Sequence, residues 1–182
     1  MSQDQNAQLN QSPEVISQIV QDDGTFPNNA AVPLLVYQGA VTIAGRDPAA
    51  VFEELFSANQ WGSSWRNGIF GFHHYHSTAH EVLGVYGGTA KVQLGGEQGA
   101  VFEVKAGDVI IIPAGVAHKN LGSSRDFRIV GAYPQGQSPD MCYGKPGERP
   151  EADQQIAGVT MPQADPVYGA QGGLREYWVT PD

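Results

Sequence analysis

Positive charge and cysteine are both scarce in this sequence of 182 residues. Ten lysines and arginines stand against 19 aspartates and glutamates, which gives a formal net charge of −9. This balance argues against nucleic acid and anionic membrane surfaces as partners, because both attract a basic face. The single cysteine, Cys142, excludes an internal disulfide and fits a reducing compartment. No neighbouring group suggests a lowered thiol pKa, so we expect Cys142 to be inert.

Signals for export and nucleotide binding are missing as well. The first residues, MSQDQNAQLNQ, lack the basic and apolar regions of a signal peptide. No apolar run approaches the roughly 20 residues that a transmembrane helix needs. The sequence contains no phosphate-binding loop and no glycine motif for dinucleotides. We therefore expect a cytoplasmic protein with no membrane partner.

Residues 13–64 are predicted to form an N-terminal extension of strand and helix before the main fold. Ahead of it, residues 1–12 are rich in Gln and Asn and predict a disordered tail. Residues 13–20 have apolar spacing that fits either a helix or a short strand, and residues 33–41 predict a buried strand. One helix is expected with Asp47 as its N-cap, because a proline and an apolar face follow directly.

Residues 65–133 change to short β segments such as EVLGVYG, AKVQLG and DVIIIPAG. Many short strands at even spacing, bounded by glycine, proline or charged turns, indicate an antiparallel sandwich or barrel. Residues 134–182 hold seven of the twelve prolines and predict an extended segment that wraps around the barrel. We expect Trp61, Trp65 and Trp178 to act as packing anchors between the helix, this segment and the barrel.

Histidine is also rare, yet four of the five histidines occur in one stretch, HHYHSTAHE, which covers residues 73–81. If residues 68–76 form a strand, alternation places His74 and His76 on one face and turns His73 to the other. Two imidazoles at this spacing can converge on one metal ion, at about 2.0–2.1 Å for zinc. The competing interpretation is a polar loop whose histidines bind nothing.

The remaining ligands must come from neighbouring strands. Glu81 opens the next predicted strand, and His118 follows the PAG turn of a later one. Three imidazoles and one carboxylate suit one divalent transition metal per chain, of the series Ni, Mn, Fe, Zn, Co or Cu, and not Ca or Mg. An octahedral ion with four protein ligands would keep two positions for water or substrate.

These positions resemble the two sequence motifs of the cupins. The first motif, G-x5-H-x-H-x4-E-x6-G, is matched at Gly68, His74, His76, Glu81 and Gly88. The second motif, G-x5-P-x-G-x2-H-x3-N, is matched at Gly107, Pro113, Gly115 and His118. The final Asn of the second motif falls on Gly122, and the chain has Asn120 instead, so no role is carried over to that Asn.

The resemblance implies one domain over residues 1–182: an all-β cupin jelly-roll (double-stranded β-helix) barrel, with one N-terminal helix and an extended C-terminal tail. It implies the same metal ligands that geometry indicated, namely His74, His76, Glu81 and His118. Segments such as DDGTFPNN, AGDVIIIPAGVAHKN and GKPGERP further resemble the small single-domain bacterial cupins of the YjlB type. Cupins are often homodimers, so the resemblance leaves a homodimer open.

Other polar side chains have weaker claims to a role. His80 fits a group behind the ligands better than a ligand. Glu81 could detach from the metal and act as a catalytic base, although plain ligation is the simpler interpretation. Arg149 either lies in a solvated loop or folds over the barrel mouth to meet an anionic substrate. Gln93 and Asn120 are candidates for polar groups on the inner wall.

Three functions follow in order of expectation. The first is a metal-dependent enzyme on a small oxygen-rich substrate, by dioxygenase, isomerase or decarboxylase chemistry, with Glu81 as the candidate catalytic group. The second is a module that binds a sugar or metabolite at the metal without turnover. The third is a structural metal that is closed to solvent. The fold does not decide among them, because one scaffold hosts many activities.

Overall fold

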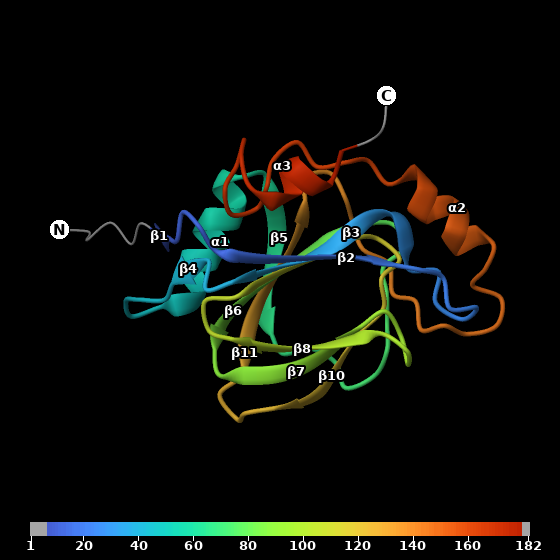
Figure 1. Cartoon of the computed structure of the whole chain (residues 1–182), viewed down its shortest axis with the longest axis horizontal. Coiled ribbons are helices and arrows are strands. Elements are labelled where there is room, and N and C mark those ends of the chain that lie inside the picture. The colour runs from blue at the N-terminus through green and yellow to red at the C-terminus, as the bar shows by residue number, and fades with distance from the viewer. Residues whose placement is uncertain (1–6, 180–182) are drawn as a thin grey trace.

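Two β-sheets packed face to face form the centre of the molecule in the computed structural model, which describes residues 7–179 (Figure 1). The larger sheet contains, in spatial order, β2 (Glu14–Val20), β3 (Asn29–Gln38), β9 (Val109–Ile112), β6 (Glu81–Gly87), β11 (Arg128–Pro134) and β5 (Trp61–Asn67). The smaller sheet contains β10 (His118–Ser123), β7 (Thr89–Leu94) and β8 (Ala100–Lys105). Every pairing between these strands is antiparallel, which confirms the predicted all-β class.

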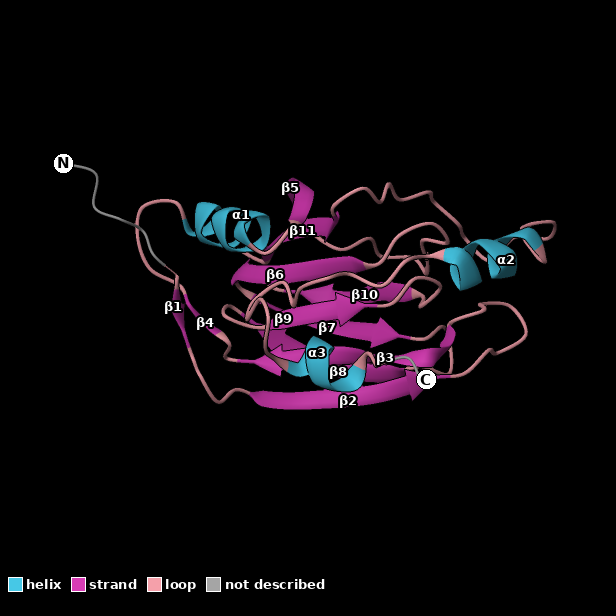
Figure 2. Cartoon of the chain, turned by 90° about the horizontal axis from the view of Figure 1, so that it is seen from above, coloured by secondary structure: helices cyan, strands magenta, loops and turns pink. Residues whose placement is uncertain are grey.

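The central strands of the larger sheet are buried on both faces, which explains their continuous apolar runs. In β3, Leu34 and Val36 belong to the core between the two sheets, whereas Leu35 and Tyr37 belong to a second core on the outer face. All four residues of β9 are buried for the same reason. A strand covered on one face only would alternate apolar and polar residues. The outer face is covered by helix α1 (Pro48–Ala58) and helix α3 (Gly173–Tyr177) (Figure 2).

Helix α1 confirms the prediction from its capping residues. Asp47 is the N-cap, and its side chain accepts a hydrogen bond from the Ala50 N–H at 3.4 Å. The helix ends at Asn59, its C-cap. Its Phe52 ring lies so close to Gly84 of β6 that a Cβ at Gly84 would stand 2.4 Å from the ring. A glycine is therefore required where the helix meets the sheet.

The N-terminal segment carries more structure than the sequence predicted. Residues 1–6 of the predicted disordered tail lie outside the described residues, but Gln8–Leu9 form strand β1, which pairs with β4 (Val41–Thr42). Of the predicted segment 13–20, Glu14–Val20 form strand β2, so the strand alternative was right. Strand β5 was not predicted, because its sequence WGSSWRN has little apolar periodicity. Its pairing with β11, more than 60 residues later, makes it a strand.

The C-terminal segment contains two short helices where the sequence predicted extended chain. One is α3, and the other is α2 (Glu151–Gly158), which has two acidic residues in its first turn. Two tryptophans anchor this segment, as predicted: Trp61 Nε1 donates to the Ala164 oxygen at 2.9 Å, and Trp178 Nε1 donates to the Pro33 oxygen at 2.7 Å. Within residues 7–179, no helix has the length and apolar character needed to cross a membrane.

Candidate metal centre

Residues 68–80 connect β5 to β6 without forming the regular strand that the sequence predicted over 68–76. Isolated backbone bridges instead join His74 to His118, and Tyr75 to Cys142. These bridges preserve the alternation of a strand locally. Tyr75 packs into an apolar cluster on one side, while the histidines before and after it line a cavity on the other. The prediction that His74 and His76 share one side was therefore right, although the predicted regular strand over 68–76 was wrong.

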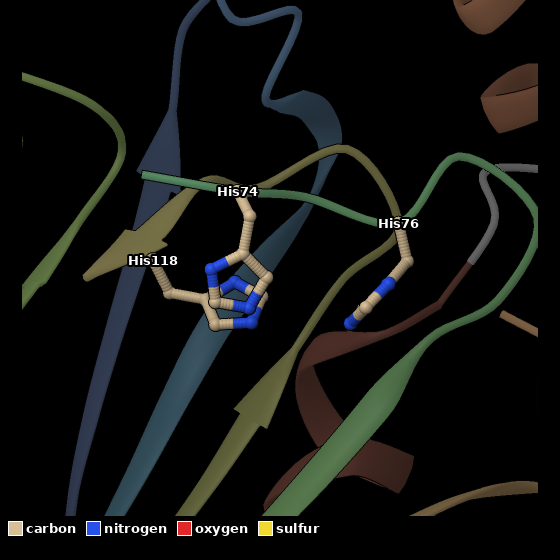
Figure 3. Close-up of side chains that lie close together, drawn as sticks. All are labelled: His74, His76 and His118. Carbon is tan, nitrogen blue, oxygen red and sulfur yellow. The ribbon is translucent and has the colours of Figure 1, made fainter. Parts of the chain in front are cut away.

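Three of the histidines form a buried cluster. One ring nitrogen each of His74, His76 and His118 lies within 4.8 Å of the other two. The ring centroids of His74 and His118 are 4.0 Å apart, and the His76 ring lies 5.6 Å from His118. Figure 3 shows the rings of His74 and His118 side by side, with the His76 ring directed toward them.

Each of the three rings is held by its Nδ1 atom. Nδ1 lies near a main-chain oxygen in every case: His74 at 3.1 Å from Phe72, His76 at 2.6 Å from Asp140, and His118 at 3.0 Å from Val116. A carbonyl oxygen can only accept, so each Nδ1 carries a proton. In the neutral rings, Nε2 then keeps a free lone pair. Histidines that bind metals are typically oriented by such a bond on the other nitrogen.

Glu81 lies beside the cluster, on a strand of the larger sheet. It shares the inner face of β6 with Leu83, because the two residues are two positions apart. Its Oε2 atom lies 3.1 Å from Nε2 of His76 and 3.3 Å from Nε2 of His118. Neighbouring ligand atoms around one ion, each about 2.1 Å from it, stand about 3 Å apart at right angles. The spacing and the donor types therefore fit a transition metal.

The electrostatics of the cluster place His74 and Glu81 in the forms that bind metals, whereas His76 must give up the proton that Glu81 stabilises on it. Burial, together with the neighbouring His118, lowers the pKa of His74 to about 3, so its ring is neutral near pH 7. Burial opposes charge on His76, yet the Glu81 carboxylate raises the pKa of His76. Burial alone would raise the pKa of Glu81, but His76 and His118 lower it well below its usual range. An ionised carboxylate and neutral imidazoles are the forms that bind metals.

The other two histidines lie outside this cluster. His73 has its Nε2 3.1 Å from a Glu97 carboxylate oxygen, without hydrogen-bond alignment, and its ring lies 5.5 Å from that of Phe26. Nδ1 of His80 accepts a hydrogen bond from the Ala114 N–H at 2.9 Å. Burial lowers the pKa of His80 to about 4. His80 therefore supports, as a neutral ring, the PAG turn that precedes His118.

A cavity of about 320 Å³ opens from the cluster. Most of its wall is apolar, and these side chains come from β5, the following loop, β6, β11 and the C-terminal segment: Trp65, Ile69, Phe70, Leu83, Ile129 and Met141. Tyr133 also lines it, and its hydroxyl accepts a hydrogen bond from Trp65 Nε1 at 2.8 Å. Burial and the nearby Glu81 raise the pKa of Tyr133.

The sequence prediction missed this wall except for Phe70, which alternation places on the same face as His74 and His76. Period-two alternation in GAYP and the residues before it already places Ile129 and Tyr133 on one face, so a signal for these two existed. Trp65 was predicted to be a packing anchor, and it lines the cavity as well. Its ring lies over Gly131, where a Cβ would stand 2.3 Å from the indole.

Three polar side chains that the sequence analysis named as candidates for the barrel mouth or inner wall lie outside the cavity. Arg149 donates to the carboxylates of Asp22 and Asp153, so it holds the loop and does not line the cavity. Asn120 closes a local turn, because its Oδ1 accepts from the Gly122 N–H at 2.8 Å. Gln93 donates to main-chain oxygens of the turn between β7 and β8. The Arg149 pairing could not be foreseen, since Asp22 is 127 residues away.

Two antiparallel sheets around three histidines and a carboxylate are the arrangement of a cupin, and the family model for the cupin domain matches residues 67–129. The uncharacterized protein YjlB of Bacillus subtilis (strain 168) is 46% identical over 158 residues, which make up 87% of this chain and 93% of that protein. The chain therefore belongs to the cupin family, as a small cupin of the YjlB type.

Solved structures with a similar fold are more distant. Procruciferin from Brassica napus is 17% identical with a TM-score of 0.35, and the match covers 62% of this chain but only 23% of that chain. The dTDP-4-dehydrorhamnose 3,5-epimerase of Elizabethkingia anophelis NUHP1 is 11% identical with a TM-score of 0.40, covering 68% and 74%. A double-stranded β-helix protein of Klebsiella pneumoniae is 16% identical with a TM-score of 0.34, covering 75% and 83%. Scores this low say nothing about the activity of the chain.

Proposed function

We propose that the chain is a metal-dependent enzyme that acts on a small oxygen-rich organic molecule. The supporting observation is the convergence of one ring nitrogen each of His74, His76 and His118, with the Glu81 carboxylate beside them, at a cavity of about 320 Å³. One divalent transition metal bound by His74, His76, His118 and Glu81 would be reachable by a ligand. A structural metal is instead enclosed by its protein ligands, so the cavity disfavours that function.

The bound ion would supply Lewis acidity or redox chemistry, for isomerisation, decarboxylation or dioxygenation. The protein itself contributes the shape and the dryness of the site. Nδ1 of each histidine is held by a main-chain oxygen, so the ring orientations are set before a substrate enters. Glu81 would accept a proton only after detaching from the ion, and its lowered pKa makes it a weak base, so ligation is its main role. Leu83 and Ile129 exclude water beside it.

Metal analysis of untagged protein, purified without added metal, tests the ligand set. We expect close to one transition-metal ion per chain, and a large loss of this content in His76→Ala. The matched control is His73→Ala, because His73 is the neighbouring histidine that lies outside the cluster. Equal metal content in His76→Ala and the wild type would show that the ligand assignment is wrong.

A module that binds a metabolite without turnover is the alternative, and the composition of the wall favours it. Apart from the four candidate ligands, only Tyr133 and Arg66 contribute ionisable side chains to the described lining. Both are already hydrogen bonded, Tyr133 to Trp65 and Arg66 to two carboxylates. Oxygen uptake and product analysis with metallated protein separate the two functions. A tight ligand that co-purifies unchanged, without turnover of any substrate tested, would favour binding.

A further inference from the structure

The wall of the cavity offers little to a polar substrate. Leu83, Ile129 and Ile69 are buried side chains that contribute only carbon to it. The Tyr133 hydroxyl lies between Trp65 Nε1 and Glu81, so its hydrogen-bonding capacity is largely used. A sugar would need several polar partners for its hydroxyls. Beyond the candidate metal ligands, the polar side chains of the lining are Arg66, Asn67 and Tyr133, and the other side chains are hydrocarbon, indole or thioether.

No free cation lines the described part of the cavity. Arg66 is the only basic side chain in the lining besides the histidines. Its guanidinium donates to both oxygens of Asp47 and to both oxygens of Glu53, at 2.7–3.0 Å. Hydrogen bonds and charge from these two carboxylates raise the pKa of Arg66. Arg66 and its two partners together carry a net negative charge, so they do not attract a strongly anionic substrate.

Exposed aromatic side chains continue from the cavity onto the surface. Phe70 lines the cavity and is 46% exposed, and its ring stacks on that of Phe72 at a centroid distance of 4.9 Å. The Phe72 ring, 44% exposed, lies 5.9 Å from that of Tyr143. Met141 lines the cavity and is also exposed. Exposed apolar side chains in such a group, at the mouth of a cavity, indicate a surface that a ligand covers.

We infer that the cavity takes a small ligand with a chelating oxygen pair, an apolar or aromatic body and at most one negative charge. This inference rests on the proposed metal site. A divalent ion held by three neutral imidazoles and one carboxylate keeps one positive charge, which one ligand anion neutralises. A ligand with two negative charges would leave the metal site with a net charge of −1 beside Leu83 and Ile129, and the lining holds no free cation to offset it, which is costly. The body of the ligand lies along Phe70.

Three chelators with the same spacing of oxygen atoms test this inference. Acetylacetone binds metals as a monoanion, malonate binds as a dianion, and benzoylacetone adds a phenyl ring to the acetylacetone frame. Zinc-loaded protein is titrated with each by calorimetry, because zinc brings no redox turnover. We expect acetylacetone to bind at least about tenfold more tightly than malonate, as a buried second charge is unpaired. We expect a further gain of about tenfold or more for benzoylacetone, from the buried ring.

Two pairs of variants localise the effects. Met141→Lys adds a cation at the mouth and should raise the affinity for malonate relative to acetylacetone at least about tenfold. Val101→Lys, at a similarly exposed residue of β8 outside the cavity, should leave this ratio unchanged. Phe70→Ala should remove most of the benzoylacetone gain, while Leu121→Ala, an exposed residue of β10 outside the cavity, should keep it.

Zinc binding is measured first by equilibrium dialysis, which separates the two proposals. Protein that binds no zinc would refute the proposed metal site itself. Zinc-loaded protein that binds malonate as tightly as acetylacetone would overturn only the inferred ligand class. The same holds if it binds none of the three chelators, or if Phe70→Ala keeps the full benzoylacetone gain.

Discussion

Nδ1 of His76 lies 2.6 Å from the main-chain oxygen of Asp140, a residue 64 positions later in the chain. The carboxylate of Asp140 in turn accepts a hydrogen bond from the Ser77 N–H at 2.6 Å and another from the Ser77 hydroxyl. Asp140 therefore forms hydrogen bonds with two consecutive residues, His76 and Ser77. Through these bonds the C-terminal segment orients one of the candidate metal ligands.

Asp140→Ala is expected to weaken metal binding about 10–100-fold, the usual effect of removing a group that orients a ligand. The main-chain oxygen and the hydrogen bond from the Asp140 N–H to the Thr78 hydroxyl remain, but both bonds from Ser77 to the carboxylate are lost, so the oxygen is held less firmly against His76. Metal affinity is measured by competition with a chelator, and unfolding by urea is followed in parallel. Asp126→Ala, at an exposed acidic residue with no such bonds, is the matched control. Unchanged affinity in Asp140→Ala would contradict the positioning role.

Gly131→Ala is expected to displace Trp65 from the cavity wall. The added Cβ would stand 2.3 Å from the indole ring, so the ring must move and its hydrogen bond to Tyr133 is lost. We expect a loss of about 1–3 kcal/mol in the free energy of unfolding, and a red shift of tryptophan fluorescence. Gly122→Ala is the control, because a Cβ at Gly122 meets nothing within 4 Å. A Gly131→Ala protein with wild-type stability and fluorescence would be evidence against this packing.

Glu148 predicts a pH dependence of stability. Its carboxylate accepts hydrogen bonds from the Tyr75 hydroxyl at 2.9 Å and from the N–H groups of Tyr143 and Gly144. Burial alone would raise the pKa of Glu148, but these bonds lower it below its ordinary value of 4.5. The unfolded chain therefore takes up this proton first as the pH falls. The stabilisation is complete above about pH 4.5 and is lost as the pH falls through the lower folded pKa.

Glu148→Gln removes this titration and keeps the size of the side chain. Below about pH 4.5, the free energy of unfolding should therefore fall less steeply with decreasing pH in the variant than in the wild type. Urea unfolding at several values between about pH 6 and about pH 3 measures both slopes. Identical slopes in the two proteins would mean that Glu148 has no lowered pKa in the folded state.

Cys142 should react slowly with alkylating reagents. Burial, with the neighbouring Asp140 carboxylate 3.3 Å from its sulfur, raises the pKa of the thiol from 9.0 to about 11. Since the thiolate is the reactive form, two pKa units reduce its population about 100-fold at about pH 8. Iodoacetamide labelling, followed by mass spectrometry, should therefore be at least about 100-fold slower than for a free peptide thiol, and normal in urea. Fast labelling of the folded protein would refute the raised pKa.

The parts of the fold with strong local signals were predictable. The N-cap Asp47 and the proline after it determine where helix α1 begins, whatever packs against it. The central strands of the larger sheet show as apolar runs because both of their faces are buried. Strand β5 and helices α2 and α3 carry no such pattern. They form where distant segments supply pairing or anchoring contacts, such as the hydrogen bond from the Leu174 N–H of α3 to the Tyr37 hydroxyl.

The amino-acid sequence by itself determined which residues can meet at the cluster. The spacing of His74 and His76 places both on one side of an extended segment, and the turn before His118 brings the third ring to them. Only the tertiary structure decided what surrounds the cluster. Arg66 is neutralised and the wall is apolar because residues from separate strands converge there. Local spacing fixes the face on which a side chain lies, but its neighbours across the cavity depend on the packing of the whole chain.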